Sequence, residues 1–521
     1  MPRLALLVAL LSWGGGSAFA QSAPAPPLTG TSKAEASFEF LLARRLEALG
    51  DSSGALEALK RAQALDPQSA EILAETAGLY ARQNKGVAAV EAAERALKID
   101  PKNNEANRLL GLLFAAWSDG GVTPPPGRTP ADLRVAAIEH LTRILDTPSV
   151  ATDLNLQLTL ARLQLRAGRA DRAVPILENI VAQAPFVTEP YTLLAEARLS
   201  LGRVDAAVDA LQRAAELNPR HYITLAELYE RQGRWAAAAA SYEQAVKTMR
   251  DAGRDVRLRW AAALLNLADG QGAQKARDTL KDFLMTSPQD TRGLFLLASA
   301  NLQMRDFAAA EEVARKLIAA DPASIPGLRA LSAALVGRRD YRAVVDLLLP
   351  FSKNVVARSK GRESDAALLL AQLAHAQSEL GEHESAIASL TAAVTSDPLS
   401  APALNSLGYT LAERGERLPE AIAFIERALK VEPDNPSYLD SLGWALFKQG
   451  RADEAEPHLR KAAIALPTQS VIQDHFGDVL ARRSKFVEAI AAWERALSGD
   501  GADIDRSAVE KKIKDAKGRQ Q

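Results

Sequence analysis

Proline recurs along this chain at a spacing that limits what the chain can fold into. Four neighbouring pairs lie 34 residues apart: Pro67 and Pro101, Pro185 and Pro219, Pro288 and Pro322, Pro433 and Pro467. A repeat of this length is one supersecondary unit that cannot bury its apolar face alone, so such units must stack on their neighbours. The chain has 521 residues, more than the roughly 250 to 300 that one hydrophobic core can serve, which also favours a repeat array.

Two columns of small side chains support this register. When each proline is placed at repeat position 32, positions 8 and 20 are each small in twelve of thirteen proposed units, with Leu264 and Val344 as the exceptions. A bulky residue at either position would push two packed helices beyond the usual 8 to 10 Å or so. Position 8 is occupied by Ala43, Ala77, Gly111, Ala161, Ala195, Ala226, Ala298, Ser332, Ala374, Gly408, Gly443 and Gly477. Position 20 is occupied by Ala55, Ala89, Ala137, Ala173, Ala207, Ala238, Ala276, Ala310, Ala386, Ala421, Ala455 and Ala489.

Each unit is expected to contain two amphipathic helices with a turn between them. In residues 436–469, Leu439, Leu442 and Leu446 recur at the spacing of one helix face. Gly450 follows this stretch, and we expect it to end the first helix in a left-handed conformation, which glycine adopts without steric cost. The same place in other units is held by Gly50, Gly168, Gly202, Gly233, Gly381 and Gly415.

These positions together resemble the tetratricopeptide-repeat family over roughly residues 36–497. The resemblance implies an all-α fold, a right-handed superhelical α-solenoid of about thirteen helix-turn-helix units with a C-terminal capping helix. In this family the first helix of each unit, helix A, lines the concave groove that holds a partner segment.

Irregular segments divide the predicted array. A Gly/Pro-rich insertion at 118–130 separates the two helices of the third unit, and a connector at 351–366 follows a degenerate ninth unit. We therefore expect an N-terminal block at 36–350, a C-terminal block of four units at 367–497 and a polar, mostly basic capping helix at 503–517. The basic end of that helix is interpreted as a solvated face rather than a lipid or nucleic-acid contact.

The first residues read as an export signal. Arg3 precedes an apolar run from Leu4 to Trp13, and Ala18-Phe19-Ala20 forms a small-x-small cleavage site, so residues 1–20 are predicted to be a signal peptide. The apolar run is about half as long as the 20 or so residues that a membrane-spanning helix needs. Residues 21–34, rich in Pro, Ala, Ser and Thr, are expected to be a flexible leader. The predicted location is periplasmic or secreted, without an anchor through a lipid-modified cysteine, because the chain has no Cys.

Composition and motifs argue against several classes of function. The formal net charge is -1, which is not the electrostatic footprint of a nucleic-acid-binding protein. There is no Gly-rich phosphate loop, no G-x-S-x-G elbow and no H-E-x-x-H helix. The six histidines show no metal-ligand spacing; His458 and His475 lie on neighbouring units, where a helix-packing or surface role is expected rather than a metal site. We therefore predict a protein that is not an enzyme and that needs neither cofactor nor metal.

The expected groove of the last three units carries acidic and aromatic residues. Positions 5, 9 and 12, which the family resemblance assigns to the groove, predict a partner-binding site formed by Asn405, Tyr409, Asp440, Trp444, Phe447, Asp474 and Asp478. Aromatic side chains at such positions would be binding anchors. The alternative is that Trp444 packs against neighbouring helices. An acidic and aromatic groove would prefer a basic or apolar extended segment.

The C-terminal repeats show a second resemblance, over residues 404–497. The run LNSLGYTLAERGERLPEAIAFIERALKVEPDNPSYLDSLGWALFKQGRADEAEPHLRKA is similar to repeats of exported bacterial proteins, a group that includes an adaptor lipoprotein of a periplasmic carboxyl-terminal processing protease. The resemblance implies a scaffold or adaptor that binds partner proteins, such as an envelope protease or a cell-wall enzyme, and organises an envelope complex. The adaptor has a cysteine after its signal peptide, whereas Gln21 stands here. The alternative function is a scaffold in polysaccharide or peptidoglycan assembly that contacts glycan directly through Tyr409, Trp444 and Phe447.

Overall fold

The computed structural model describes most of the chain. The described residues are 30–120, 127–147, 150–249, 252–322, 324–353, 361–501 and 504–519. The predicted signal peptide at 1–20 lies outside them, as do residues 21–29 of the predicted leader. The first described helix, α2, begins at Gly30, inside the segment expected to be a leader.

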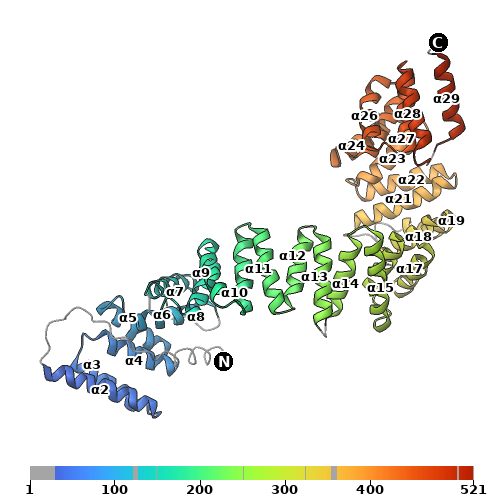
Figure 1. The fold of residues 1–521 in the computed structure, drawn as a ribbon. Coiled ribbons are helices and arrows are strands. Elements are labelled where there is room, and N and C mark those ends of the chain that lie inside the picture. Colours follow the sequence, from blue (N-terminus) through green and yellow to red (C-terminus); the bar gives the residue numbers. More distant parts are fainter. Residues whose placement is uncertain are drawn as a thin grey trace. The chain divides into compact units, whose positions relative to one another are not determined.

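Helices are the only regular elements in these residues, and they follow one another with short turns (Figure 1). The first twelve are α2 (Gly30–Ala48), α3 (Ser52–Leu65), α4 (Ala70–Arg82), α5 (Gly86–Ile99), α6 (Asn104–Ser118), α7 (Pro130–Leu145), α8 (Leu154–Arg166), α9 (Ala170–Gln183), α10 (Thr188–Ser200), α11 (Val204–Leu217), α12 (His221–Arg231) and α13 (Trp235–Thr248). The next eight are α14 (Arg254–Leu265), α15 (Gly270–Thr286), α16 (Thr291–Gln303), α17 (Phe307–Ala320), α18 (Ile325–Gly337), α19 (Tyr341–Ser352), α21 (Glu363–Glu379) and α22 (His383–Ser396). The last seven are α23 (Ala401–Glu413), α24 (Leu418–Val431), α25 (Pro436–Lys448), α26 (Ala452–Ala465), α27 (Ser470–Arg482), α28 (Phe486–Ser498) and α29 (Arg506–Arg519).

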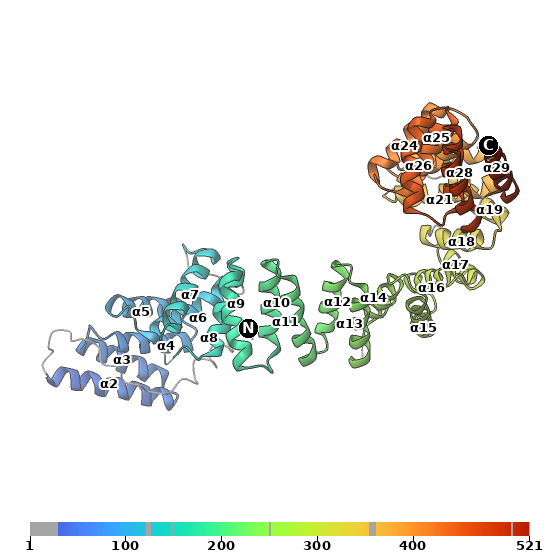
Figure 2. The ribbon, with the colours of Figure 1, turned by 45° about the horizontal axis from the view of Figure 1, so that its top comes forward.

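The chain forms two compact units that meet in sequence near residue 250. The first contains residues up to Arg234 together with 240–250, and the second contains 235–239 and the residues from Asp251 onward. In both units consecutive helices pack as A-B hairpins, for example α10 with α11 and α25 with α26 (Figure 2). The described helices make thirteen A-B pairs in chain order, followed by the lone helix α29, so the predicted α-solenoid is confirmed.

Helix A of one hairpin also packs on helix A of the next. This is seen for α4 with α6 and α6 with α8 in the first unit, and for α21 with α23, α23 with α25 and α25 with α27 in the second. Side chains at equivalent positions of successive A helices therefore lie next to one another. In the second unit these contacts run from α14 to α27, so this stacking gives that unit a continuous surface made of helix A residues.

The small-residue columns lie at the helix crossings. Every alanine and serine at positions 8 and 20 is buried. At Gly443, a Cβ atom would lie 2.5 Å from Cγ of Leu459 on α26, which is closer than real side chains approach. The small residues at position 8 are therefore required by the close approach of the two helices within a hairpin.

The left-handed turns confirm the register and correct it in one unit. All seven predicted glycines have positive φ, among them Gly450 at 86°. In eleven hairpins a left-handed residue follows position 8 by seven residues, and in the seventh hairpin the left-handed residue after helix A is Ala268, with φ 54°. Position 8 of this hairpin is therefore the buried Ala261, not Leu264. The assignment was wrong because α15 has 17 residues where most of its counterparts have 14, so the proline register is shifted along helix A.

The irregular segments fall between helices. α6 ends at Ser118 and α7 begins at Pro130, while residues 121–126 between them lie outside the described residues. The predicted connector at 351–366 falls within the second unit, where α19 packs against α21. α29 lies where the capping helix is expected and packs against α28. The proposed division of the array at 351–366 stays a prediction.

In the part of the chain that the structure describes, no helix is both long and apolar enough to cross a membrane.

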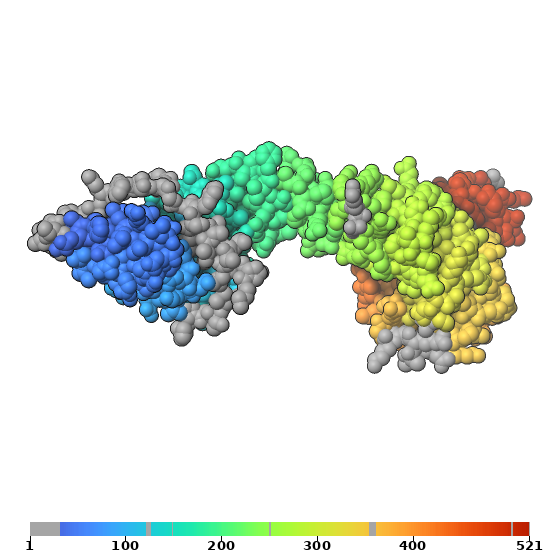
Figure 3. Space-filling view, turned by 90° about the horizontal axis from the view of Figure 1, so that it is seen from below, coloured from blue at the N-terminus to red at the C-terminus, as the bar shows by residue number. Residues whose placement is uncertain are grey.

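Figure 3 shows the surfaces of both units, with the N-terminal helices in blue and the C-terminal helices in red.

Candidate functional site

Three successive A helices, α23, α25 and α27, carry the seven predicted groove residues. Because α23 packs on α25 and α25 on α27, positions 5 and 9 of each helix come next to those of its neighbour. Asp440 and Trp444 are buried, and the other five residues are half-buried. The Oδ1 atom of Asn405 is buried without a hydrogen-bond partner among the described residues.

His475 on α27 lies at the centre of this group and was not predicted to belong to it. Its Nδ1 donates to Asp440 on α25, at 3.0 Å from Oδ1 and 3.2 Å from Oδ2. Its ring stacks on Trp444, with the two centroids 3.9 Å apart and the planes 13° apart, and the Tyr409 ring lies 6.5 Å away. His475 therefore joins residues of all three A helices.

Burial and charge act on His475 in opposite directions. Burial alone would lower the pKa of the imidazole, because it disfavours the charged form. The carboxylates of Asp440, Asp474 and Glu413 together outweigh burial, with Asp440 contributing most, and they raise the pKa of His475 above its ordinary value. His475 and Asp440 thus form a buried ion pair when the imidazole is protonated.

The Trp444 side chain is packed among its neighbours rather than exposed to solvent. Its side chain is 8% exposed, and its Nε1 donates to Oε2 of Glu413 on α23 at 2.5 Å. The Phe447 ring stacks on it at 5.3 Å, and Nζ of Lys448 lies 4.9 Å from its ring centre. Trp444 therefore links α23 to α27 through Glu413 and His475, and it supports the surface from beneath.

The last helix completes the group with a lysine. Nζ of Lys512 on α29 lies 2.8 Å from Oδ1 of Asp474 and 2.7 Å from Oδ1 of Asp478, and Nε1 of Trp493 donates to Asp478 at 3.1 Å. Burial raises the pKa of Asp478, and the like charge of Asp474 adds to the increase, while Lys512 opposes it. The two carboxylates are thus held side by side at a cost that one lysine offsets only in part.

We call this group the acidic-aromatic surface. It consists of Asn405, Tyr409, Glu413, Asp440, Trp444, Phe447, Lys448, Asp474, His475, Asp478 and Lys512. Its four carboxylates face two lysines and one histidine, so the ionised surface carries one net negative charge when His475 is protonated and two when it is neutral. The arrangement has no nucleophile paired with a base.

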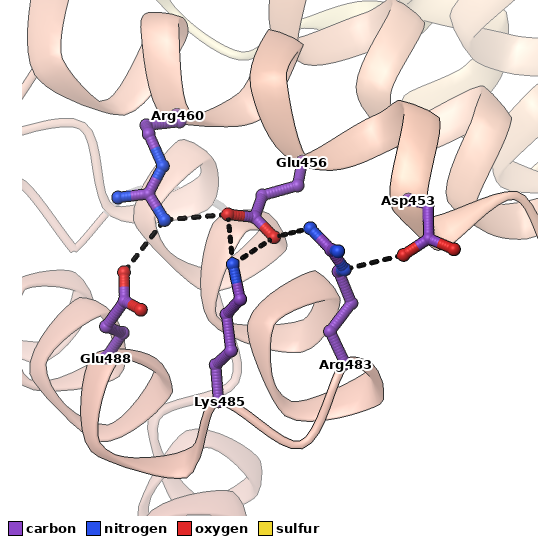
Figure 4. A network of polar contacts seen from close by, with 6 residues as sticks. All are labelled: Asp453, Glu456, Arg460, Arg483, Lys485 and Glu488. Atoms are coloured by element: carbon purple, nitrogen blue, oxygen red, sulfur yellow. Dashed lines mark hydrogen bonds and ion pairs between the residues drawn. The ribbon is translucent and has the colours of Figure 1, made fainter.

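A second polar cluster lies on α26, on the turn between α27 and α28, and on the first turn of α28 (Figure 4). Glu456 is buried and accepts from Arg460 at 2.7 Å, from Lys485 at 2.8 Å and from Arg483. Arg460 also pairs with Glu488 at 2.8 Å, and Arg483 with Asp453 at 2.7 Å. We call these six residues the Glu456 network. Its three acidic and three basic side chains give the network no net charge when all six are ionised.

The Glu456 network determines the titration of its central carboxyl group. Burial alone would raise the pKa of Glu456, but hydrogen bonds from Arg460, Lys485 and Arg483 lower it to about 2. Two of these partners flank Ser484, which adopts a left-handed φ of 60° in the turn. The network therefore fixes a strained turn of the last hairpin to the preceding one.

The described residues contain no group of three or more His, Asp or Glu side chains arranged to hold a metal ion. His475 instead packs on Trp444 and pairs with Asp440.

Three models of the tetratricopeptide repeat match this chain. One matches residues 40–116, 158–222, 371–436 and 416–470, a second matches 222–256 and a third matches 291–324. Together the matches cover more than half of the sequence, and they lie within the range predicted from the proline spacing.

Among curated proteins, the TPR repeat-containing protein PA4667 of Pseudomonas aeruginosa is 44% identical over 85 residues. This stretch is 16% of the present chain and 14% of that relative, so the chain covers only a small part of the relative's length.

Solved structures show a more distant similarity. The Cut9-Hcn1 hetero-tetramer of the APC/C is 12% identical, covers 94% of this chain and 99% of its own, and has a TM-score of 0.40. The structure of Naa15/Naa10 bound to HypK-THB is 18% identical, covers 88% and 68%, and has a TM-score of 0.41. MamA is 21% identical over 36% of this chain and 93% of its own, with a TM-score of 0.29.

Proposed function

Because this chain belongs to the tetratricopeptide-repeat family, we propose that it is an exported, non-enzymatic scaffold that binds partner proteins along its helix A surface. The repeats support a protein-binding scaffold, since stacked helical hairpins present extended surfaces that other proteins bind. We also propose that the complex lies in the cell envelope and that the C-terminal repeats bind the partner.

The observation that carries the proposal is the connected surface across three consecutive repeats. Glu413, Trp444 and His475 come from α23, α25 and α27 and contact one another in series, so the surface is held as one piece. Its carboxylates exceed its bases, which favours a partner segment with basic side chains. A surface that is fixed before binding loses little conformational entropy when a partner binds.

A partner that binds in an extended conformation suits this surface. Tyr409, Phe447 and Asn405 are half-buried and lie at groove positions of α23 and α25, beside the buried Trp444. We propose that an envelope protease or a cell-wall enzyme supplies this segment.

The glycan-binding alternative has less support. A sugar ring stacks on a free aromatic face, and Trp444 is stacked on His475 and Phe447 and only 8% exposed. Half-buried Tyr409 and Phe447 remain as partial platforms. The packing of Trp444 thus favours the protein-binding proposal.

Site-specific photo-crosslinking tests the binding surface. A benzophenone amino acid in place of Tyr409, on the proposed surface, is compared with the same substitution at Val487, an exposed residue of the B helix α28. Irradiation of living cells should give a discrete protein adduct for position 409 and none for position 487. Equal adducts at both positions, or none at 409, would contradict binding through helix A residues.

Export is tested separately by sequencing the N-terminus of the protein recovered from cell fractions. Cleavage as predicted gives an N-terminus at Gln21 and a protein in the periplasm or the medium. Recovery with Met1 in the cytoplasm would contradict the envelope part of the proposal and leave the binding surface to be judged by the crosslinking result.

A further inference from the structure

The first described helix, α2, exposes apolar side chains along one face. Phe38 is 65% exposed, Leu41 is 62% exposed, and Leu49 just beyond the helix is 73% exposed. Ala34 and Ala48 are also exposed and lie on the same face, because residues three, four and seven apart in a helix align. Apolar side chains gathered in this way mark an interaction surface more often than scattered ones do.

The same repeat positions are covered in the hairpin of α25 and α26. Phe38 and Leu41 stand at positions 3 and 6 of helix A. In α25 these positions are Tyr438 and Ser441, and both are buried. The covering element there is helix B of the preceding hairpin, since α24 packs on α25. No described helix precedes α2, and Phe38 and Leu41 at these positions are exposed.

The other terminus of the array is closed differently. α29 buries only Val509 and Ala516 against α28, and the residues that it exposes are mostly charged, among them Arg506, Lys511 and Lys514. A polar face of this kind gives no apolar match for α2. Head-to-tail stacking of one chain on the next is therefore disfavoured, which leaves pairing of like with like as the way for copies to cover this face.

The charges on α2 are complementary to themselves. Glu35 and Arg45 are exposed and have no ion pair among the described residues, in contrast to Glu39, which pairs with Arg61 at 2.8 Å. In an antiparallel pair of α2 helices whose two-fold axis passes between Phe38 and Leu41, Glu35 of one copy lies within one residue of the level of Arg45 of the other, about 1.5 Å along the helix axis. The same pairing places Phe38 of one copy beside Leu41 of the other.

We propose that a second copy of this chain docks on this face, with α2 packed antiparallel against α2 of its partner. The contact is one helix pair, smaller than a standard stable interface, so the dimer is in exchange with the monomer, with a dissociation constant on the order of 10 µM. Dimerisation presents two helix A surfaces in one particle, which lets a scaffold gain avidity for a partner with two binding segments.

Sedimentation equilibrium of the intact chain tests this proposal over about 1 to 200 µM. The wild type should shift from one mass to twice that mass within this range. The variant Phe38→Glu with Leu41→Glu should stay monomeric, which corresponds to a loss of at least about 20-fold in affinity. The matched control is Phe186→Glu with Val187→Glu, which changes two other exposed apolar residues and should dimerise like the wild type.

Charge exchange tests the antiparallel geometry. Glu35→Arg and Arg45→Glu should each weaken self-association about threefold or more, because each places like charges across the contact. An equimolar mixture of the two variants restores opposite charges at both ends and should form a heterodimer that associates like the wild type. A wild type that is monomeric at about 200 µM, an unaffected Phe38→Glu/Leu41→Glu variant, or a mixture that is no stronger than its components would overturn the proposal.

Discussion

Two polar clusters in the C-terminal unit contain similar acidic and basic residues but differ in net charge and in the helices that they join. The Glu456 network joins three acids to three bases and ties the turn after α27 to α26. The acidic-aromatic surface joins α23, α25 and α27, and its carboxylates exceed its bases. The first cluster is balanced and its central carboxylate is fully paired, while the second keeps a negative charge that its own bases do not neutralise.

This difference in charge balance distinguishes a cluster that stabilises the fold from a cluster that is available to bind a partner. A balanced network stabilises the hairpin and leaves little electrostatic potential for a ligand. An unbalanced one costs some stability, because Asp474 and Asp478 repel each other, and it attracts basic groups. Aromatic packing offsets this cost, since Trp444 and His475 stack within the surface.

The largest loss of stability is expected from substitution of Trp444, because the acidic-aromatic surface contains a packed aromatic side chain and the Glu456 network contains none. Trp444→Ala leaves a cavity between Glu413, Phe447 and His475 and should destabilise the C-terminal unit by about 3 kcal/mol. Hydrogen-exchange mass spectrometry of peptides from α23, α25 and α27 measures this. Phe447→Ala is the matched control and should cost less, because that side chain is half-buried. A change below about 1 kcal/mol would show that Trp444 is not part of a packed surface, and the comparison would fail.

Removing the central charge of the Glu456 network should have the next largest effect. Glu456→Gln leaves Arg483 and Lys485 without their buried acceptor and should lower the free energy of unfolding by about 2 kcal/mol at pH 7. Because the pKa of Glu456 falls from 4.5 to about 2 in the folded protein, its stabilisation is present above pH 4.5 and is lost as the pH falls toward 2. Urea titrations at several pH values should therefore show wild type and variant converging in acid. A gap between them that stays constant down to pH 2 would contradict the network.

His475 should give the opposite dependence on pH, with a smaller effect. Its raised folded pKa means that the Asp440 pair stabilises fully below the ordinary value of 6.5 and is lost as the pH rises through the folded value. The difference in unfolding free energy between the wild type and His475→Asn should thus shrink from pH 6 to pH 9. A difference that grows with pH would mean that burial, not Asp440, controls this histidine.

Much of the fold could be predicted because the same residue types recur at the same positions in many repeats. Position 8 is small where helices A and B cross, and Gly443 shows the physical reason in its contact with Leu459. The prediction failed at Leu264 because the proline marks the end of helix B, and α15 is longer than most of its counterparts. Counting back seven residues from a left-handed turn would have located Ala261, but Ala268 is not a residue type that signals such a turn.

The seven groove residues follow from repeat positions alone, and their role in binding stays a prediction. Trp444 and Asp440 lie one turn apart on α25, but the sequence cannot show that His475 of α27 contacts both of them, because position 6 usually faces the preceding hairpin. Lys512 was missed since it lies beyond the last repeat, 34 residues after Asp478. The signal that could have found both was the excess of carboxylates at positions 5 and 9, which buried positions tolerate only with a base nearby.

Peptide binding by variants of the two clusters tests the central claim most directly. The probe is a fluorescein-labelled decapeptide that alternates Lys and Leu, its control alternates Glu and Leu, and affinity is measured by anisotropy in low salt. Asp474→Asn with Asp478→Asn removes two negative charges from the acidic-aromatic surface and should weaken binding of the basic peptide about tenfold, while the unfolding free energy stays within about 1 kcal/mol. Glu456→Gln should do the reverse, lowering stability with no change in affinity. Equal binding of both peptides, or equal loss of affinity in both variants, would contradict the assignment of recognition to one cluster and folding to the other.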